Sequence, residues 1–312
     1  MIKSVICERL GIEKPLFQGG MAWIADARLA AAVSNAGGLG LISSILGGPE
    51  AVRAEIRKAK KLTDKPFGVN VMLADPNAAA VADLVVEEGV GVVTTGAGSP
   101  APYMERWKAA GIRVIPVVAS VAYALKMQEL GATAVIAEGA ESGGHIGDTN
   151  TLALLPQILD AVEIPVLAAG GVFDGRSAAA MLLMGACGVQ VGTRFLVADE
   201  CRVHETYKER LIKASDVGTM VTGNPSGTPS AASRPRSPRN SPGWRPIRPS
   251  RPRKSAPSGR APSGKRFSTA TSPAAVSSPG KWRALLRGKS PRRTLSMISS
   301  AAPSACSPAR PI

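Results

Sequence analysis

The chain has 312 residues, of which 45% are hydrophobic, and a formal net charge of +15, which is enough sequence for one large domain or two smaller ones. The charge is unevenly divided, because 224–312 holds 18 of the 38 basic residues, 16 of the 25 prolines and none of the 23 acidic residues. The remaining segment, 1–223, has a net charge of −3, which argues against a nucleic-acid or membrane-surface function for this part of the chain.

Three features of the sequence indicate the cellular location of the protein. The four cysteines lack metal-ligand spacing, so neither disulfides nor a metal site is expected. Residues 1–15 lack the uninterrupted apolar core of a signal peptide. No apolar run approaches the roughly 20 residues that span a bilayer. We therefore expect a cytoplasmic protein without membrane association.

From residue 16 to residue 193, short apolar runs alternate with longer segments of helical period. Most of the runs are rich in Val and Ile and apolar on both faces, as covered parallel strands are. The predicted strands are 16–19, 39–43, 67–71, 90–95, 113–118, 134–138, 165–169 and 189–193. The predicted helices are 26–36, 50–61, 78–88, 100–110, 121–130, 152–162 and 175–184. This alternation predicts an α/β fold, a (β/α)8 TIM barrel.

Active sites of such barrels lie at the carboxyl ends of the strands, and the unusual residues of this sequence fall there. The sixth strand runs into AEGAESGGHIG, which places His145 behind Gly143 and Gly144. An imidazole titrates near neutral pH and is suited to proton transfer, although a histidine that only caps the loop is an alternative. Glycine pairs or glycine–threonine also follow the seventh and eighth strands, where phosphate groups bind in this fold. The sequence therefore predicts a phosphate-bearing ligand.

The segments that hold these loops read QGGMAWIADARLAAAVSNAGGLGLI, KPFGVNVML, VVTTGAG, IPVVASVAYA, AEGAESGGHIG, IPVLAAGGVFDGR, GVQVGTRFLVA and TMVTG. In order and spacing they resemble the FMN-dependent enoyl-acyl-carrier-protein reductase II family, which belongs with the nitronate monooxygenases, formerly 2-nitropropane dioxygenases. The resemblance covers residues of about 3 to 223. It implies a TIM barrel with FMN at the carboxyl ends of the strands. It also implies NADH or NADPH as reductant and an enoyl thioester on acyl carrier protein or coenzyme A as substrate.

The resemblance also implies roles for individual residues. His145 matches the functional histidine of the family and would orient or protonate the substrate. The flavin would contact a set of glycines and polar residues from several strand ends. The implied cofactor-binding residues are Gly20, Met21, Asn70, Glu138, Gly144, Gly170, Gly171, Gln190, Gly192 and Thr193.

Three readings of the function remain at this point. The strings SNAGGLG, FGVNVML and ESGGHIG resemble the reductases more than the nitronate enzymes, which favours enoyl reduction in fatty acid synthesis. Oxidation of alkyl nitronates with O2 is the alternative within the same flavin pocket. An inactive barrel remnant is the third reading, because the family's C-terminal lid is missing from the sequence. A homodimer is one possible assembly.

The resemblance stops at residue 223, and 224–312 is a Pro/Ser/Arg-rich basic tail that predicts disorder. Where the family continues with Gly-His-Pro-Val-Arg, residues 227–231 read GTPSA. One codon choice for GTPSA contains His-Pro-Val-Arg in a shifted frame, so we hypothesise that the tail is out-of-frame. A genuine basic tail that binds phosphate backbones or anionic lipid is the competing interpretation.

Overall fold

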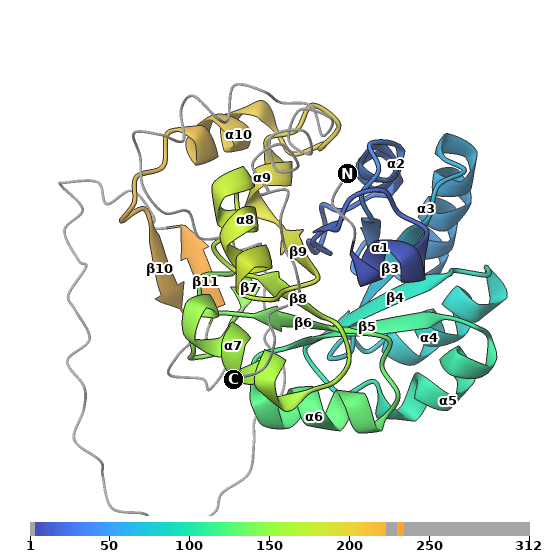
Figure 1. Ribbon diagram of the computed structural model, residues 1–312. Helices are drawn as coiled ribbons and strands as arrows, with labels where there is room; N and C mark the ends of the chain where they lie inside the picture. The colour runs from blue at the N-terminus through green and yellow to red at the C-terminus, as the bar shows by residue number, and fades with distance from the viewer. Residues whose placement is uncertain (1–3, 223–229, 234–312) are drawn as a thin grey trace, which may run out of the picture.

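The computed structural model describes residues 4–222 and 230–233. Its parallel strands form a ring, and helices lie outside these strands (Figure 1). The eight strands are hydrogen-bonded in the order β1-β9-β8-β6-β5-β4-β3-β2. Leu39 closes the ring between β1 and β2, because its N–H donates to the Leu16 carbonyl and its carbonyl accepts from the Gln18 N–H, each at 2.9 Å. The prediction of a (β/α)8 barrel is confirmed.

Every predicted strand and helix is present, with ends that shift by a few residues. The strands are β1 (Leu16–Gln18), β2 (Gly40–Ser43), β3 (Phe67–Met72), β4 (Val92–Gly96), β5 (Arg113–Val118), β6 (Val135–Glu138), β8 (Val166–Ala169) and β9 (Gly188–Val191). The helices around them are α2 (Ala27–Asn35), α3 (Pro49–Leu62), α4 (Ala78–Glu87), α5 (Ala101–Ala109), α6 (Val121–Glu129), α7 (Thr151–Ala161) and α8 (Gly175–Leu183).

Local chemistry explains where these helices start and stop. Asp26 caps α2 by accepting the Leu29 N–H at 3.0 Å, and Asp174 forms a capping box with Ser177 at the start of α8. Most of these helices are followed by a glycine with left-handed backbone, for example Gly89 after α4 with φ of +59°. These turns lie at the amino ends of the strands, so the amino end of the barrel is built from helix-ending turns.

The hydrophobic core has an inner and an outer layer. The inner layer fills the ring with alternate strand residues such as Phe17, Ile115, Ile136 and Leu167, each fully buried. The outer layer lies between the strands and the surrounding helices. Apolar side chains on both faces of a parallel strand are therefore covered, which explains the continuous apolar runs of the sequence.

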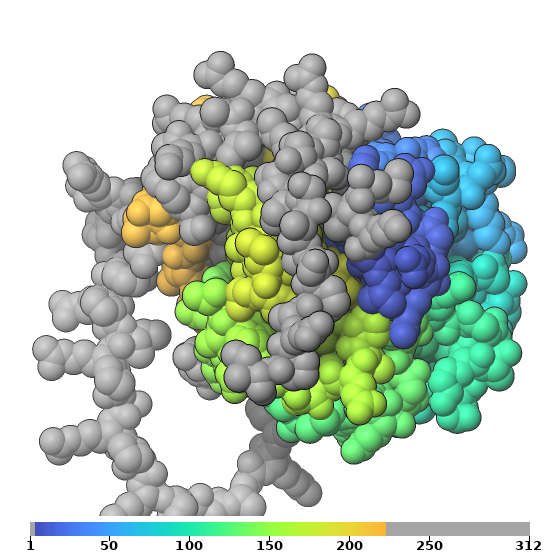
Figure 2. Space-filling model, in the orientation of Figure 1, coloured from blue at the N-terminus to red at the C-terminus, as the bar shows by residue number. Residues whose placement is uncertain are grey.

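A short helix, α1 (Val5–Leu10), closes the amino end of the barrel. Its Ile6 and Leu10 are buried in the inner core layer, and the Ser4 hydroxyl donates to the Cys187 carbonyl just before β9. The sequence did not predict this helix, because six residues are too few to establish a helical period. In the space-filling view the blue N-terminal segment lies between yellow-green and teal parts of the chain (Figure 2).

The remaining elements follow or branch from the last strands. They are α9 (Thr193–Leu196), α10 (Glu205–Ile212), and a small sheet of β7 (Gly144–His145), β10 (Thr219–Thr222) and β11 (Ser230–Ser233). The short strand β11 lies within the predicted tail, the rest of which falls outside the described residues. His204 caps α10 by accepting the Thr206 N–H at 3.2 Å. Within the described ranges, every helix is too short or too polar to cross a bilayer.

Candidate functional site

The carboxyl ends of β1, β9, β8 and β6 form a continuous rim that carries most of the predicted site residues. The Gly19 N–H donates to the Val191 carbonyl at 2.8 Å, which joins the end of β1 to the end of β9. Along the sheet, Ala169 pairs with both Gln190 and Glu138. The fold therefore places Gly20, Glu138, Gly170, Gln190 and Gly192 at the same edge of the barrel.

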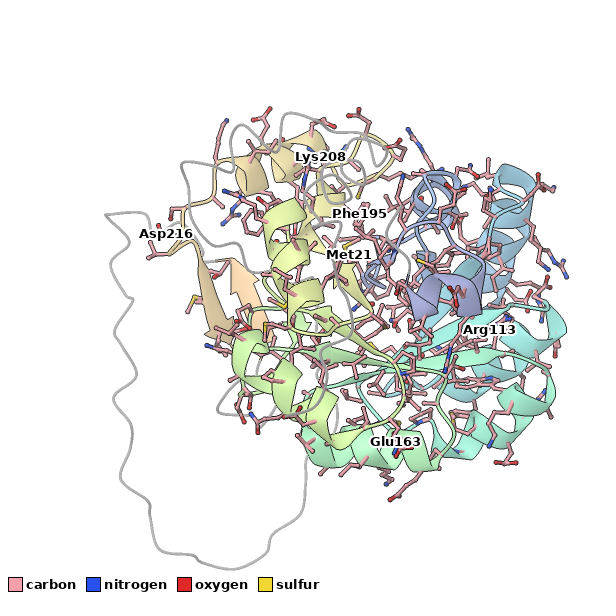
Figure 3. The ribbon with its side chains drawn as sticks, in the orientation of Figure 1. Met21, Arg113, Glu163, Phe195, Lys208 and Asp216 are labelled. Atoms are coloured by element: carbon pink, nitrogen blue, oxygen red, sulfur yellow. The ribbon has the colours of Figure 1, made fainter. Side chains whose placement is uncertain are left out.

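Asn70 joins this rim from β3. Its side-chain amide donates to the Gly20 carbonyl at 3.4 Å, and its amide oxygen accepts the Thr94 hydroxyl at 2.8 Å. A Cβ atom built on Gly20 would lie 2.2 Å from the Asn70 Cβ, so only glycine fits there. Met21 is half-buried against the cluster that contains Phe195, and the two labelled side chains lie close together in Figure 3.

The loops after β8 and β9 have the backbone expected of an anion cradle. Gly170 and Gly171 have left-handed φ values of +95° and +71°. A Cβ atom on Gly192 would meet nothing within 4 Å, so open space adjoins this residue. Asp174 already occupies the N-terminus of α8, whereas α9 starts at Gly192 and Thr193 without a side-chain cap among the described residues. Among the helices that follow β6, β8 and β9, the short helix α9 is therefore the one whose start has no side-chain cap from the described residues.

Arg194, in the first turn of α9, is a buried cation next to this cradle. Only 3% of its surface is exposed, and burial lowers the pKa of its guanidinium to about 10, so it remains charged at neutral pH. The sequence contains a signal for it, since it is the one charged residue of the run GVQVGTRFLVA. It was not among the predicted cofactor-binding residues, and Thr193 belongs to α9 rather than to the preceding strand.

The loop after β6 crosses the rim and carries His145. It begins at Gly139, whose N–H donates to the Ala169 carbonyl at 3.0 Å. It returns near the end of β5, where a Cβ atom on Gly147 would lie 2.8 Å from the Ala119 Cβ. Between these points Gly144 has φ of +82°, and His145 is exposed and pairs with Ser230 of β11. The imidazole therefore belongs to a loop that spans the ends of three barrel strands.

Glu138 is half-buried at the end of β6, directly before this loop. Burial raises the pKa of its carboxyl to about 7, and the Ser142 hydroxyl, which favours the charged form, opposes the rise. A carboxyl that titrates near neutral pH can accept or donate a proton there, which is a frequent property of active-site groups.

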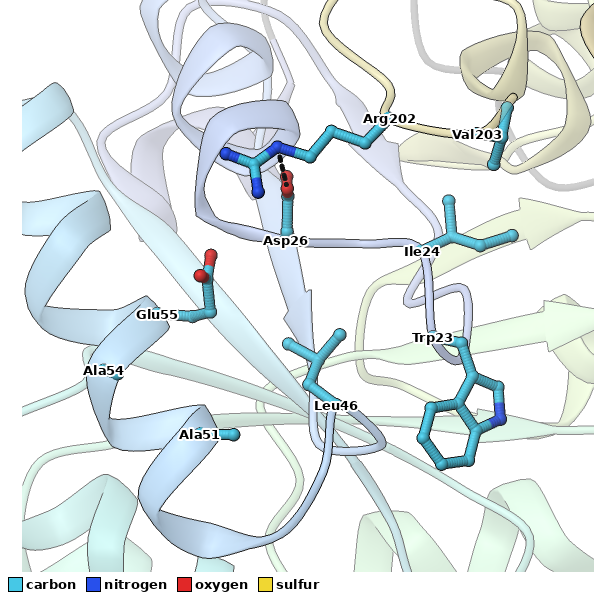
Figure 4. A pocket seen from close by; sticks show the side chains of 9 residues that line it. All are labelled: Trp23, Ile24, Asp26, Leu46, Ala51, Ala54, Glu55, Arg202 and Val203. Carbon is cyan, nitrogen blue, oxygen red and sulfur yellow. Dashed lines mark ion pairs between the residues drawn. The ribbon is translucent and has the colours of Figure 1, made fainter. Parts of the chain in front are cut away.

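A groove of about 410 Å³ lies beside the rim, between the loops after β1 and β2 and the segment before α10 (Figure 4). Trp23, which is 51% exposed, forms one wall, with a left-handed φ of +65° that is costly for a non-glycine residue. The other lining residues are Ile24, Asp26, Leu46, Ala51, Ala54, Glu55, Arg202 and Val203.

The charged groups of the groove are engaged with each other or with the backbone. Arg202 Nε pairs with Asp26 Oδ2 at 3.1 Å, and Glu55 Oε2 accepts the Ala27 N–H at 2.7 Å. The apolar side chains therefore dominate what the groove offers to a ligand.

Comparison with known proteins decides the family. A family model described as nitronate monooxygenase matches residues 3–236. The chain belongs to the nitronate monooxygenase family. The match continues past residue 223, to include β11.

Two relatives and one solved structure show sequence identities to the chain of between 32% and 47%. A Mycobacterium tuberculosis (strain ATCC 25618 / H37Rv) protein named (3aS,4S,5R,7aS)-5-hydroxy-7a-methyl-1-oxo-octahydro-1H-indene-4-carboxyl-CoA dehydrogenase is 43% identical over 231 residues, 73% of this chain and 65% of its own length. A probable nitronate monooxygenase of Staphylococcus aureus (strain JH9) is 32% identical, covering 70% of this chain and 75% of its own. The solved structure of FabK from Thermotoga maritima is 47% identical, with a TM-score of 0.74 and 75% of each chain covered. The chain thus spans 65% of the length of the dehydrogenase.

A flavin is implied by the nitronate monooxygenase family, and the rim residues fit its phosphate. The left-handed glycines and the open space at Gly192 leave backbone N–H groups accessible, and Arg194, two residues after Gly192, carries a buried positive charge. The carboxylates of Glu141 and Asp174 cap the N-termini of α7 and α8, whereas the start of α9 has no side-chain cap among the described residues. These backbone and guanidinium donors suit an anionic ligand such as a phosphate.

Proposed function

We propose that the chain is an FMN-dependent oxidoreductase that uses NADH or NADPH to reduce the double bond of an enoyl thioester. The observation that carries this proposal is the single rim on which the left-handed glycines after β8, the uncapped start of α9 and the His145 loop meet. The sequence motifs that resemble the reductases support the same chemistry, and the family supplies the flavin.

The predicted cofactor residues divide into two groups along this rim. Gly170, Gly171, Gln190, Gly192 and Thr193 would hold the ribityl phosphate at the ends of β8 and β9. The ring system would lie toward the opposite side of the mouth. Its proposed contacts are Gly20, Met21, Asn70, Glu138 and Gly144.

Bound FMN would supply hydride transfer, and the protein would supply orientation and proton handling. His145 is exposed on the loop over the mouth, where a substrate would approach, and an imidazole can give or take a proton at neutral pH. The hydrogen bonds from Asn70 to Gly20 and from Thr94 to Asn70 fix the amide that would face the ring.

The relatives and the groove support the proposed substrate class. The dehydrogenase relative acts, by its name, on a carboxyl-CoA compound, which supports a thioester carried on coenzyme A or acyl carrier protein. The groove beside the rim, with Trp23 and Leu46 in its walls, has room and apolar surface for the hydrocarbon part of such a thioester.

Nitronate oxidation is the second candidate. The family model carries this name, and a Staphylococcus aureus relative is named a probable nitronate monooxygenase. In that reaction His145 would handle the proton at the nitro-bearing carbon, with O2 as the oxidant.

The deciding experiment is an absorbance spectrum of the purified full chain, followed by anaerobic titration with NADH. The proposal expects flavin absorbance, bleaching by NADH, and recovery of the oxidised spectrum when a crotonyl thioester is added without O2. Recovery only with O2, together with turnover of an alkyl nitronate, would favour the monooxygenase. A colourless protein that takes up no FMN would support an inactive barrel remnant.

A further inference from the structure

Thr151, the first residue of α7, occupies a buried position between two loops of the proposed flavin site, with 3% of its surface exposed. We propose that Thr151 and Glu141 act as a positioning pair that fixes the shape of both loops. One loop is 139–147, which carries His145, and the other contains Gly170 and Gly171. The expected effect on FMN binding rests on the proposed function, whereas the geometry of the pair rests on the contacts described below.

The Thr151 side chain reaches acceptors on both loops. Its Oγ1 lies 2.9 Å from Glu141 Oε2 in the first loop, and 3.1 Å and 3.0 Å from the carbonyl oxygens of Ala169 and Gly170 at the second. A hydroxyl has one proton to donate, so these acceptors share it. Movement of the Thr151 side chain would therefore change hydrogen bonds both in the loop after β6 and at the end of β8.

The glycines of both loops are packed against the same residue. A Cβ atom on Gly139 would lie 2.2 Å from the Thr151 backbone nitrogen and Oγ1, and one on Gly170 would lie 2.6 Å from Oγ1. On Gly171 the nearest atom would be the Glu141 Cβ, at 3.4 Å. The two loops are thus held at a separation that leaves no room for a methyl group beside Thr151.

Glu141 completes the pair by capping α7 from the preceding loop. Asn150 makes no side-chain cap bond to the described residues of α7, and Glu141 Oε2 instead accepts the Thr151 N–H at 2.9 Å. A carboxylate at a helix N-terminus is favoured by the helix dipole. This contact anchors the loop four residues before His145, so it sets the direction in which the histidine segment leaves the barrel.

The test compares three variants of the full chain. Thr151→Val keeps the shape of the side chain but removes the hydroxyl, whereas Thr151→Ser keeps the hydroxyl and removes the methyl group. Thr63→Val is the matched control, because Thr63 is also buried, at 8% exposure, and its Oγ1 accepts the Lys65 N–H at 3.0 Å at the amino end of the barrel. The readouts are the FMN dissociation constant, from flavin fluorescence, and amide hydrogen exchange of 139–147 and 170–171 in protein without FMN.

We expect Thr151→Val to weaken FMN binding by about tenfold, as for loss of a buried hydrogen bond, and to speed exchange in both loops. Thr151→Ser and Thr63→Val should leave both readouts within about twofold of the parent chain, since neither removes the shared donor. Unchanged exchange in Thr151→Val, or equal changes in Thr63→Val, would overturn the positioning pair. Failure of the parent chain to bind FMN would count against the proposed function, and the exchange data would then decide the positioning pair alone.

Discussion

Glu88 at the amino end of the barrel and Glu138 at the carboxyl end have pKa values shifted in opposite directions. At the amino end Glu88 is 9% exposed and pairs with Arg57 and Arg53. The hydrogen bond from Arg57, which has the largest effect, and that from Arg53 hold the pKa of Glu88 below its usual range. At the carboxyl end the pKa of Glu138 is raised to about 7 by burial. A paired carboxylate favours the folded state, whereas a buried one near neutral pKa is costly when charged. Glu88 therefore stabilises the fold at the amino end, whereas Glu138 at the carboxyl end retains a proton that chemistry can use.

Backbone strain follows the same division. Within the described ranges, the non-glycine residues with left-handed φ are Trp23 and Ala97, which lie in loops after β1 and β4. The amino-end turns place glycine at such positions, as at Gly89 and Gly111. Non-glycine residues with a strained left-handed backbone occur frequently in functional loops. The following variants test whether the two ends differ in this way.

The largest expected effect is on turnover, at the carboxyl end. His145→Ala should lower kcat by about 100-fold or more, as for loss of a group that handles a proton, while FMN stays bound. Steady-state kinetics and the flavin spectrum of the same sample measure the two quantities. His204→Ala is the matched control, since this exposed histidine caps α10. Equal kcat values for His145→Ala and the parent chain would remove the proposed role.

The next largest effect is on stability, at the amino end. Ile6→Ala removes a fully buried side chain from the helix that closes the barrel, and should cost about 3 kcal/mol in the free energy of unfolding. Urea denaturation measures this change. The FMN dissociation constant should not move, because Ile6 packs with the inner core layer and not with the rim. Weakened FMN binding in a folded Ile6→Ala protein would show that the two ends are coupled.

A pH series on the protein without FMN compares the two carboxyl groups directly. The folded-state pKa of Glu138, about 7, lies above the ordinary 4.5, so the folded state keeps a proton that the unfolded state releases between these values. The free energy of unfolding should therefore fall as pH rises from 4.5 to 7, by at most about 3 kcal/mol. Glu138→Gln should remove this fall.

Glu88→Gln should behave in the opposite sense. Because the folded-state pKa of Glu88 is lowered, its contribution is present at neutral pH and is lost as pH falls through that depressed value. The variant should be less stable than the parent chain at pH 7 and closer to it in acid, as measured by urea denaturation. Parallel pH profiles for Glu138→Gln and the parent chain would contradict the contrast between the ends.

The repeating part of the fold could be predicted from the sequence, because its signals are local. The predicted strand 113–118 coincides with β5, since an apolar run between a glycine and a serine cap defines both of its ends. The strand β7 could not be predicted, because its two residues are extended only by pairing with Ser230 and Ala231, far along the chain.

The candidate site divides in the same way. Glycines such as Gly170 and Gly192 could be placed by their position after a strand. The contacts of Thr151 could not, because they join loops that the sequence separates. Arg194 follows a strand in an apolar run, and only the structure reveals that its charge is buried.

The smallest expected stability effect is at Trp23, where strain and packing oppose each other. Trp23→Gly relieves a left-handed backbone but loses a half-exposed indole and adds freedom to the unfolded chain, so the free energy of unfolding should change by less than about 1 kcal/mol. If Trp23 forms the wall of an acyl groove, KM should rise for a long-chain enoyl thioester and stay nearly constant for a crotonyl thioester. Leu62→Ala, at an exposed apolar residue that ends α3 at the amino end, should affect neither KM. A loss of several kcal/mol in Trp23→Gly with no change in chain-length preference would make the indole part of the scaffold, and the strain at the carboxyl end would then need another explanation than substrate binding.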